Sequence, residues 1–94
     1  MKLADVCNGA VHITVEGAII DVAPANGKTF TLKEMQDYVG GYVEVMRVPW
    51  LDDAYIAFDE DGIMKQLPRN SVASLVYQSR IVGNALVYRE DQID

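Results

Sequence analysis

Apolar and polar residues alternate along the first regular stretch of the chain, residues 11–15, which reads Val-His-Ile-Thr-Val. A period of two is typical of a strand with one buried face. Glu16 and Gly17 interrupt the alternation, and residues 18–22 resume it with β-branched side chains. The pattern predicts a β-hairpin with Gly17 in the turn, because glycine adopts a positive φ without steric cost.

The clearest predicted element is a short helix that begins after Thr31 and ends at Gly40. Thr31 and Glu34 fit a capping box, in which each side chain accepts a hydrogen bond from the other residue's backbone N–H. Gly40 suits the left-handed conformation that ends many helices. A helix of about two turns is too short to persist alone, so we expect it to pack against a sheet. The face expected to pack consists of Leu32, Met35 and Val39, with Tyr38 beside them.

Residues 42–48 predict the next strand, which Pro49 ends. Apolar side chains lie on both of its faces, a pattern typical of a central strand that is covered on both sides. Residues 54–58 predict another strand. The acidic segment 59–62 predicts a turn, after which residues 63–65 are expected to pair back as a short strand.

Ser71 is a candidate N-cap for a second short helix over residues 72–77, and residues 85–88 predict the last strand. The side chains expected to point inward from this helix are Val72, Leu75 and Val76. Connections this short do not make parallel crossovers. The sequence therefore predicts an α+β domain with a mostly antiparallel sheet of about five or six short strands and two short helices.

The composition restricts the class of protein and the kinds of site that the chain can form. The 94 residues are 50% hydrophobic and 23% charged, which fits a single globular domain over residues 1–94. Only residues 1–8 and 90–94 are expected to be loosely ordered. The one cysteine, Cys7, excludes an internal disulfide framework and a zinc site built from a cysteine cluster. We expect a cytoplasmic protein without a membrane partner, because no apolar run approaches about 18 residues and no secretory pattern is present.

The net charge of −6 argues against binding to duplex nucleic acid, because neutralisation of phosphates dominates that affinity. A small basic pocket remains compatible with this charge. We expect no cofactor and no metal, since the chain has a single histidine, His12, and the acidic turn lacks the final glutamate of a calcium loop. No nucleophile–base pair emerges either, and His12 is interpreted as a surface residue. The chain is therefore not expected to be an enzyme.

The loop at residues 67–70 is the most informative candidate site. Arg69 carries a planar fork of five donors, and Asn70 can bond either a nucleotide base or its own backbone. One interpretation is a turn that leads into the second helix; the other is recognition of an anion or a nucleotide. Trp50, Tyr55, Tyr77 and Tyr88 are candidate stacking residues, although each aromatic also fits a core or an interface. The candidate ligand-binding residues are Arg69, Asn70, Arg80, Lys65, Trp50 and Tyr42.

Two further features have alternative interpretations. Gly40 and Gly41 fit a helix stop followed by a tight path into the sheet, but they also let a ligand approach the backbone. Glu44 lies among apolar residues in a predicted strand. It is either part of an ion pair, a residue of an exposed sheet edge, or a carboxylate that binds a ligand or partner.

Three segments, in order, carry a resemblance to a known family. They are a helix that runs into Val-Gly-Gly-Tyr-Val-Glu (residues 32–45), an acidic-Gly turn with Leu-Pro-Arg-Asn (residues 59–70), and Ile-Val-Gly-Asn-Ala-Leu-Val (residues 81–87). Over residues 19–88 the chain resembles a small uncharacterised family of phages, plasmids and Gram-positive bacteria, catalogued as a domain of unknown function. The resemblance implies a setting in mobile genetic elements, such as a phage accessory protein that blunts a host defence.

Three functions stay open at this stage. The first is a non-enzymatic binding protein, expected to be a homo-oligomer, that sequesters a nucleotide-like host signal in a pocket between subunits. The second is an inhibitor whose acidic surface docks on a basic site of a host protein. The third is a structural accessory protein with no small ligand. The acidic surface of the second hypothesis comprises Asp52, Asp53, Asp59, Glu60 and Asp61.

Overall fold

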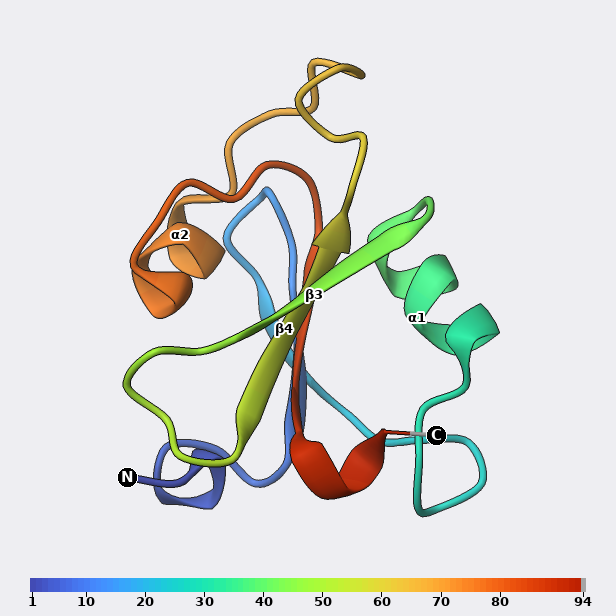
Figure 1. Cartoon of the computed structure of the whole chain (residues 1–94), viewed down its shortest axis with the longest axis vertical. Helices are drawn as coiled ribbons and strands as arrows, with labels where there is room; N and C mark the ends of the chain where they lie inside the picture. The colour runs from blue at the N-terminus through green and yellow to red at the C-terminus, as the bar shows by residue number, and fades with distance from the viewer. Residues whose placement is uncertain (94) are drawn as a thin grey trace.

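A five-stranded antiparallel sheet with strand order β2-β1-β5-β4-β3 runs through the centre of the molecule. The computed structural model describes residues 1–93, in which one helix lies on each side of this sheet (Figure 1). The strands are β1 (Ala10–Ile13), β2 (Ile19–Val22), β3 (Val43–Arg47), β4 (Ala54–Asp59) and β5 (Ala85–Arg89). The helices are α1 (Leu32–Val39) and α2 (Ser71–Tyr77), and two 3-10 turns are η1 (Leu3–Asp5) and η2 (Glu90–Gln92). The predicted α+β class, the single small domain and the antiparallel sheet are confirmed.

The sheet separates two hydrophobic cores, because successive residues of a strand point to opposite faces. On the α2 face, Ile56 of β4 and Val87 of β5 belong to one buried cluster. On the α1 face, Ala57 of β4 and Leu86 of β5 belong to another, together with Phe30. A chain of this size thus buries both faces of its central strands with only two short helices.

The central strand is β5, which is buried at four of its five positions. The prediction of a covered central strand at residues 42–48 is wrong, because β3 forms an edge of the sheet and is exposed at four of its five positions. Its apolar residues on both faces stay accessible, since the single short helix on each face mainly covers the inner strands. The predicted hairpin of β1 and β2 is confirmed, with φ of 95° at Gly17.

Helix α1 has the predicted capping box and the predicted stop. Thr31 Oγ1 accepts from the Glu34 backbone N–H at 3.2 Å, and Glu34 Oε1 accepts from the Thr31 N–H at 3.0 Å. Gly40 ends the helix with φ of 90°. Met35 and Val39 are buried as predicted.

The prediction that Leu32 packs on the sheet is wrong, because its side chain is 57% exposed. Leu32 is the first residue of α1, and the first turn of this helix lies away from the strands (Figure 1).

The second helix differs from its prediction in its cap and in its buried face. Asn70, rather than Ser71, caps α2, because Asn70 Oδ1 accepts from the Ala73 backbone N–H at 3.0 Å. The buried side chains are the small residues Ala73 and Ser74, and Ser74 Oγ accepts from the Ile81 N–H at 2.9 Å. Leu75 was expected to point inward but is exposed, whereas Val72 and Val76 pack against the core as predicted.

The predicted short strand at residues 63–65 is wrong, because this segment is a series of turns. The N–H of Lys65 donates to the carbonyl of Asp61 at 2.9 Å, so the backbone bonds locally rather than across a ladder. Ile63 and Met64 are both exposed at the tip.

Both ends of the chain, expected to be loosely ordered, place a buried side chain in the fold. Leu3 is buried in η1, and its N–H donates to Asp53 Oδ1 at 2.8 Å. Gln92 is buried in η2, and its carbonyl accepts from the Phe30 N–H at 2.8 Å. Asp94, the last residue of the expected loose tail, lies outside the described residues. None of the helices in residues 1–93 has both the length and the apolar character to cross a bilayer.

Candidate functional site

Arg69 and Arg80 lie beside one short antiparallel ladder. Arg69 forms a bridge with Val82, and the N–H of Asn70 donates to the Ile81 carbonyl at 2.8 Å. Residues that face each other across an antiparallel pair project to the same side. The side chain of Arg69 therefore leaves the ladder on the side of Val82, which lines a hollow together with Arg80.

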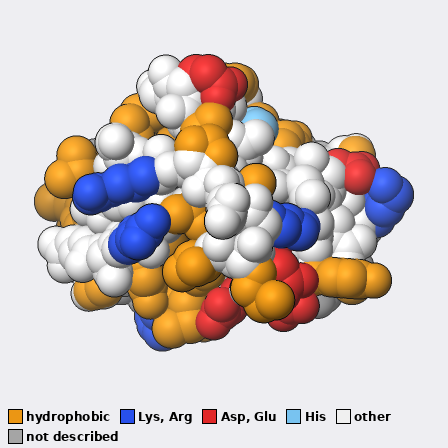
Figure 2. Space-filling view, turned by 90° about the horizontal axis from the view of Figure 1, so that it is seen from above, with side chains coloured by type: hydrophobic (Ala, Val, Ile, Leu, Met, Phe, Trp, Pro, Cys, Tyr) orange, Lys and Arg blue, Asp and Glu red, His pale blue; other side chains and the backbone are white. Residues whose placement is uncertain are grey.

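Both of these arginines are exposed and free to bind an external anion. Among residues 1–93, neither has a carboxylate oxygen within 4.0 Å, whereas Arg47 pairs with Glu90 at 3.9 Å and Arg89 pairs with Asp91 at 3.0 Å. Figure 2 shows basic side chains gathered on the left of the molecule, the flank on which α2 lies, next to apolar surface. A chain with net charge −6 thus has a local cluster of positive charge.

The hollow beside Arg80 has a volume of about 120 Å³ and mixes three kinds of side chain. Arg80 is cationic, Glu44 and Glu60 are anionic, and Ile63 and Met64 are apolar and exposed. An arginine can bind a phosphate through two parallel hydrogen bonds, while carboxylates accept from amino and hydroxyl groups. The set suits a ligand that carries an anionic group, donor groups and an apolar surface.

Asn70 does not face this hollow but lies fully buried beneath the ladder. Its Nδ2 donates to the carbonyls of Ile13 and Gly83 at 2.9 and 3.0 Å, and its Oδ1 accepts the α2 capping bond. The amide is therefore occupied within the chain. Asn70 holds the segment that carries Arg69 in place, and it is a positioning residue rather than a ligand contact.

Lys65 is engaged in an ion pair. Its Nζ lies 2.7 Å from Asp59 Oδ2, and the Asp59 side chain is only 1% exposed. The hydrogen bond to Asp59 raises the pKa of Lys65, and the negative charges of Asp59 and Asp61 raise it further. The pair packs against Gly41, where a Cβ would lie 2.6 Å from Lys65 Nζ and 2.7 Å from Asp59 Oδ2. The twin glycines thus serve a helix stop at Gly40 and a close contact at Gly41.

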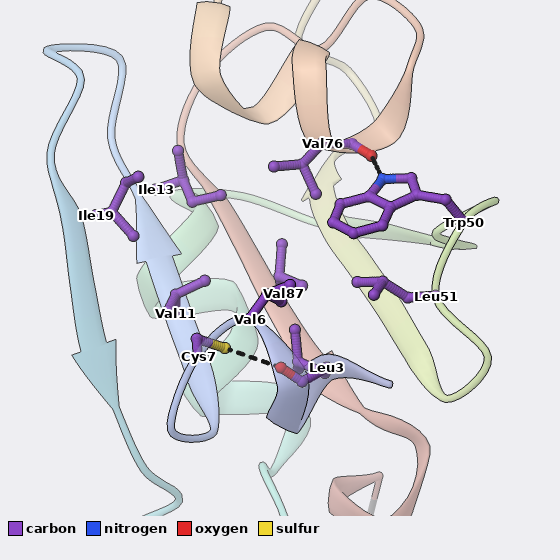
Figure 3. Close-up of a pocket in the computed structure, with 10 residues that line it drawn as sticks. All are labelled: Leu3, Val6, Cys7, Val11, Ile13, Ile19, Trp50, Leu51, Val76 and Val87. Carbon is purple, nitrogen blue, oxygen red and sulfur yellow. Dashed lines mark hydrogen bonds between the residues drawn. The ribbon is translucent and has the colours of Figure 1, made fainter. Parts of the chain in front are cut away.

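Tyr42 and Trp50 lie in two other places. Tyr42 is exposed and lines an open groove of about 350 Å³ with Lys65, beside α1. Trp50 lies in the loop between β3 and β4, and its Nε1 donates to the Val76 carbonyl at 2.6 Å (Figure 3). Of the candidate set, Arg80 alone lines the hollow, and Arg69 lies on the adjoining ladder opposite Val82, while the other four lie elsewhere.

The remaining aromatic candidates serve the fold. Tyr88 is buried, and burial together with nearby Tyr55 raises its pKa to about 12. Tyr55 stacks on Tyr88 at 6.2 Å between ring centroids, and Tyr77 contacts Phe58 at the same separation. These rings stabilise the two faces of the sheet.

Other polar candidates are placed by local contacts. Glu44 lies exposed on the edge strand, which fits the interpretation as an edge residue. His12 is half-buried, with Nε2 3.1 Å from the Tyr38 carbonyl oxygen. Asp52 pairs with the N-terminal amino group at 3.0 Å. Residues 1–93 contain no group of three or more histidine, cysteine or acidic side chains able to hold a metal ion.

Sequence reasoning missed the groups that complete the hollow. Glu60 was assigned to an acidic surface and Met64 to a short strand, yet both lie with Arg80. Neither residue carries a periodic signal, because the turn that positions them depends on the buried Asp59. Its Oδ1 accepts from the Asp61 N–H at 2.8 Å.

The three segments behind the resemblance meet at one end of the sheet. Besides the contact of Gly41, a Cβ on Gly62 would lie 2.7 Å from Val82 Cγ2, and one on Gly83 would lie 2.8 Å from Leu67 Cδ1. The glycines of all three segments therefore permit close approach of the others. Searches of curated proteins and of solved structures gave no match. The sequence profile of one family matches residues 10–94, a region that includes the N-terminal strand and the arginine ladder, and the chain belongs to this family, the domain of unknown function DUF3846.

Proposed function

We propose that the protein is a non-enzymatic binding protein for a small anionic ligand of the nucleotide type, held by Arg69 and Arg80. One observation carries the proposal: two arginines that lack a carboxylate partner among residues 1–93 lie at one short ladder, Arg69 within it opposite Val82 and Arg80 directly before Ile81. Two exposed guanidinium groups on neighbouring segments suit a phosphate or pyrophosphate.

The neighbours of the arginines favour a nucleotide over inorganic phosphate. Glu44 and Glu60 would accept hydrogen bonds from amino or ribose hydroxyl groups. Ile63 and Met64 would contact the face of a base. A bare phosphate would use only the cationic part of this set.

A second copy of the chain would complete the site. The hollow of about 120 Å³ is smaller than the ~300 Å³ at which ordinary ligand sites begin, so one copy would enclose only part of a nucleotide. Glu44 lies on β3, an edge strand with exposed Val45 and Met46. Pairing of two copies through β3 would bury this edge and bring another surface against the ligand.

In this proposal the protein acts in a phage or another mobile element and sequesters a nucleotide-type signal of a host defence. Binding without turnover is sufficient for that role, because a tightly held signal cannot reach its receptor. The host cell cytoplasm would be the compartment in which such a signal is met.

Isothermal titration against cyclic dinucleotides and ADP-ribose tests the proposal. Arg69→Ala and Arg80→Ala should each weaken binding by about 10- to 100-fold, because a hydrogen bond to a charged group contributes about 1.5–3 kcal/mol. Lys28→Ala is the control: it removes one positive charge from an exposed loop that lines neither the arginine ladder nor the hollow. It should change the affinity for the nucleotide by less than about twofold. No binding of any of these nucleotides by the wild-type protein, or an equal loss in all three variants, would refute the proposal.

The structure does not favour the alternative of docking through an acidic surface. Asp59 is buried and pairs with Lys65, Asp53 accepts from the N–H of Leu3, and Asp52, although exposed, pairs with the N-terminal amino group. Measurements at increasing salt concentration distinguish nucleotide binding from docking through an acidic surface. Docking driven by exposed charges weakens steeply with ionic strength, whereas binding in an enclosed pocket weakens less.

A further inference from the structure

Another pocket lies on the α2 face of the sheet, and it shares no lining residue with the hollow beside Arg80 (Figure 3). Val11, Ile13 and Val87 project from β1 and β5 and form its floor, and all three are buried. Leu3 of η1 and Leu51 of the loop before β4 flank this floor. The floor is thus formed by two inner strands of the sheet, β1 and β5.

The mouth of the pocket is also apolar. Val6, Ile19 and Trp50 line it and are exposed, with Ile19 60% exposed on the edge strand β2. The Trp50 ring is held by its hydrogen bond to the Val76 carbonyl of α2, so this wall is fixed before any ligand arrives. Exposed apolar side chains around a buried apolar floor give a hydrocarbon group a continuous path from solvent.

The polar groups of the wall are already satisfied within the chain. The Trp50 N–H donates to Val76, and the Cys7 thiol donates to the Gly9 carbonyl at 2.8 Å. A ligand therefore meets no free donor or acceptor from these side chains, and a polar ligand would lose its hydrogen bonds to water without replacement. A water molecule in the pocket is also poorly stabilised, because a buried water needs two to four polar partners.

The size of the pocket sets the size of the ligand. Its volume is about 180 Å³, and an apolar cavity of about 150 Å³ can stay dry and bind benzene. We propose that this pocket binds one short hydrocarbon group, either a small ring or the end of an alkyl chain whose polar head stays outside the mouth. The site is separate from the arginine hollow and does not depend on the nucleotide proposal.

The chain contains a single tryptophan, Trp50, so its fluorescence reports on the pocket directly. We would titrate the protein with benzene, which represents a free hydrocarbon, and with straight-chain 1-alcohols of increasing length, which represent the chain of an amphiphile. Saturable binding of either probe supports the proposal. For the alcohols, affinity should rise about fourfold per methylene, and the rise should stop once the pocket is filled.

Two variants on adjacent residues of β2 provide a matched pair. Ile19 lies on the pocket side, whereas Ile20 faces the other side of the sheet and is 47% exposed. Ile19→Asp should weaken binding of the probes at least about tenfold, because it places a charge at the apolar mouth. Ile20→Asp should leave the affinity unchanged, and so should Arg69→Ala.

Three outcomes would overturn the proposal. The first is a linear, non-saturating response of Trp50 fluorescence to all probes. The second is an equal loss of affinity in both β2 variants. The third is dissociation of a dimer by Ile19→Asp alone in sedimentation, together with no binding by the wild type, since a second copy would then occupy the pocket.

Discussion

Asn70 is the residue on which the second helix and the arginine ladder both depend. Its side chain caps α2 and bonds two buried carbonyls, those of Ile13 and Gly83. Asn70→Ala should lower the free energy of unfolding by about 3 kcal/mol, because it removes a helix cap and leaves buried acceptors unpaired. Chemical denaturation measures this change.

Ser71→Ala is the matched control, because Ser71 follows the cap but is exposed at the first position of α2. It should change the free energy of unfolding by less than about 0.5 kcal/mol. A larger loss from Ser71→Ala than from Asn70→Ala would contradict the assignment of the cap.

Glu34 makes the free energy of unfolding depend on pH in the acid range. Backbone hydrogen bonds from Thr31 and then Ala25 lower the pKa of Glu34 below its ordinary value of 4.5. A carboxyl group whose pKa is lower in the folded state stabilises that state above its ordinary pKa. This contribution is lost as the pH falls through the folded pKa.

Glu34→Gln should therefore be less stable than the wild type at neutral pH, and the difference should shrink below pH 4.5. Thermal unfolding of both proteins from about pH 6 to about pH 3 measures the trend. Glu16→Gln, in the exposed turn between β1 and β2, serves as the control. A difference between Glu34→Gln and the wild type that stays constant across this range would count against the capping contacts.

Residues that act locally could be predicted from the sequence. Thr31, Glu34 and Gly40 form a cap and a stop within one helix, so their spacing alone was sufficient. The sequence was sufficient to single out Asn70 and Arg69 as candidates. It was not sufficient to show that the two residues have different roles. Whether an amide points inward or toward a ligand depends on Ile13, which is 57 residues away in sequence.

At the scale of elements, the connection of α1 to β3 links the helix to the acidic turn. Gly41→Ala should lower the free energy of unfolding by about 1–3 kcal/mol, because the new Cβ would overlap the Asp59–Lys65 pair. In a double-mutant cycle with Lys65→Ala, the loss of unfolding free energy in the double variant should be smaller than the sum of the losses in the two single variants. Lys65 is one of the overlapped groups, so its removal relieves part of the overlap. Full additivity, measured by chemical denaturation, would show that Gly41 does not act through this pair.

Most elements were predictable, and their positions in the sheet were not. Residues 42–48 and 85–88 both read as apolar strands, yet β3 lies at the edge and β5 at the centre. A strand's own pattern shows which side chains are apolar but not how many neighbours cover them. Leu75 was misplaced for a related reason, because α2 packs through Val72, Ala73 and Val76 and leaves Leu75 on its outer side.

At the scale of the whole molecule, the exposed edge β3 favours assembly through this strand. We expect the protein to sediment as a dimer, and Val45→Lys on β3 should give a monomer, because an edge lysine opposes strand pairing. Ile20→Lys on the opposite edge β2 should leave the dimer intact. A wild-type protein that remains monomeric at high concentration, or a dimer broken only by Ile20→Lys, would contradict assembly through β3.

The proposed function depends on Arg69 and Arg80 together holding an anionic ligand. The most direct measurement is an NMR titration that follows the side-chain Nε–Hε signals of the four arginines while a nucleotide found by calorimetry is added. The signals of Arg69 and Arg80 should shift together with one dissociation constant, while those of Arg47 and Arg89 should stay in place. A nucleotide that binds without moving either signal, or that moves only residues around Tyr42, would contradict the proposed function.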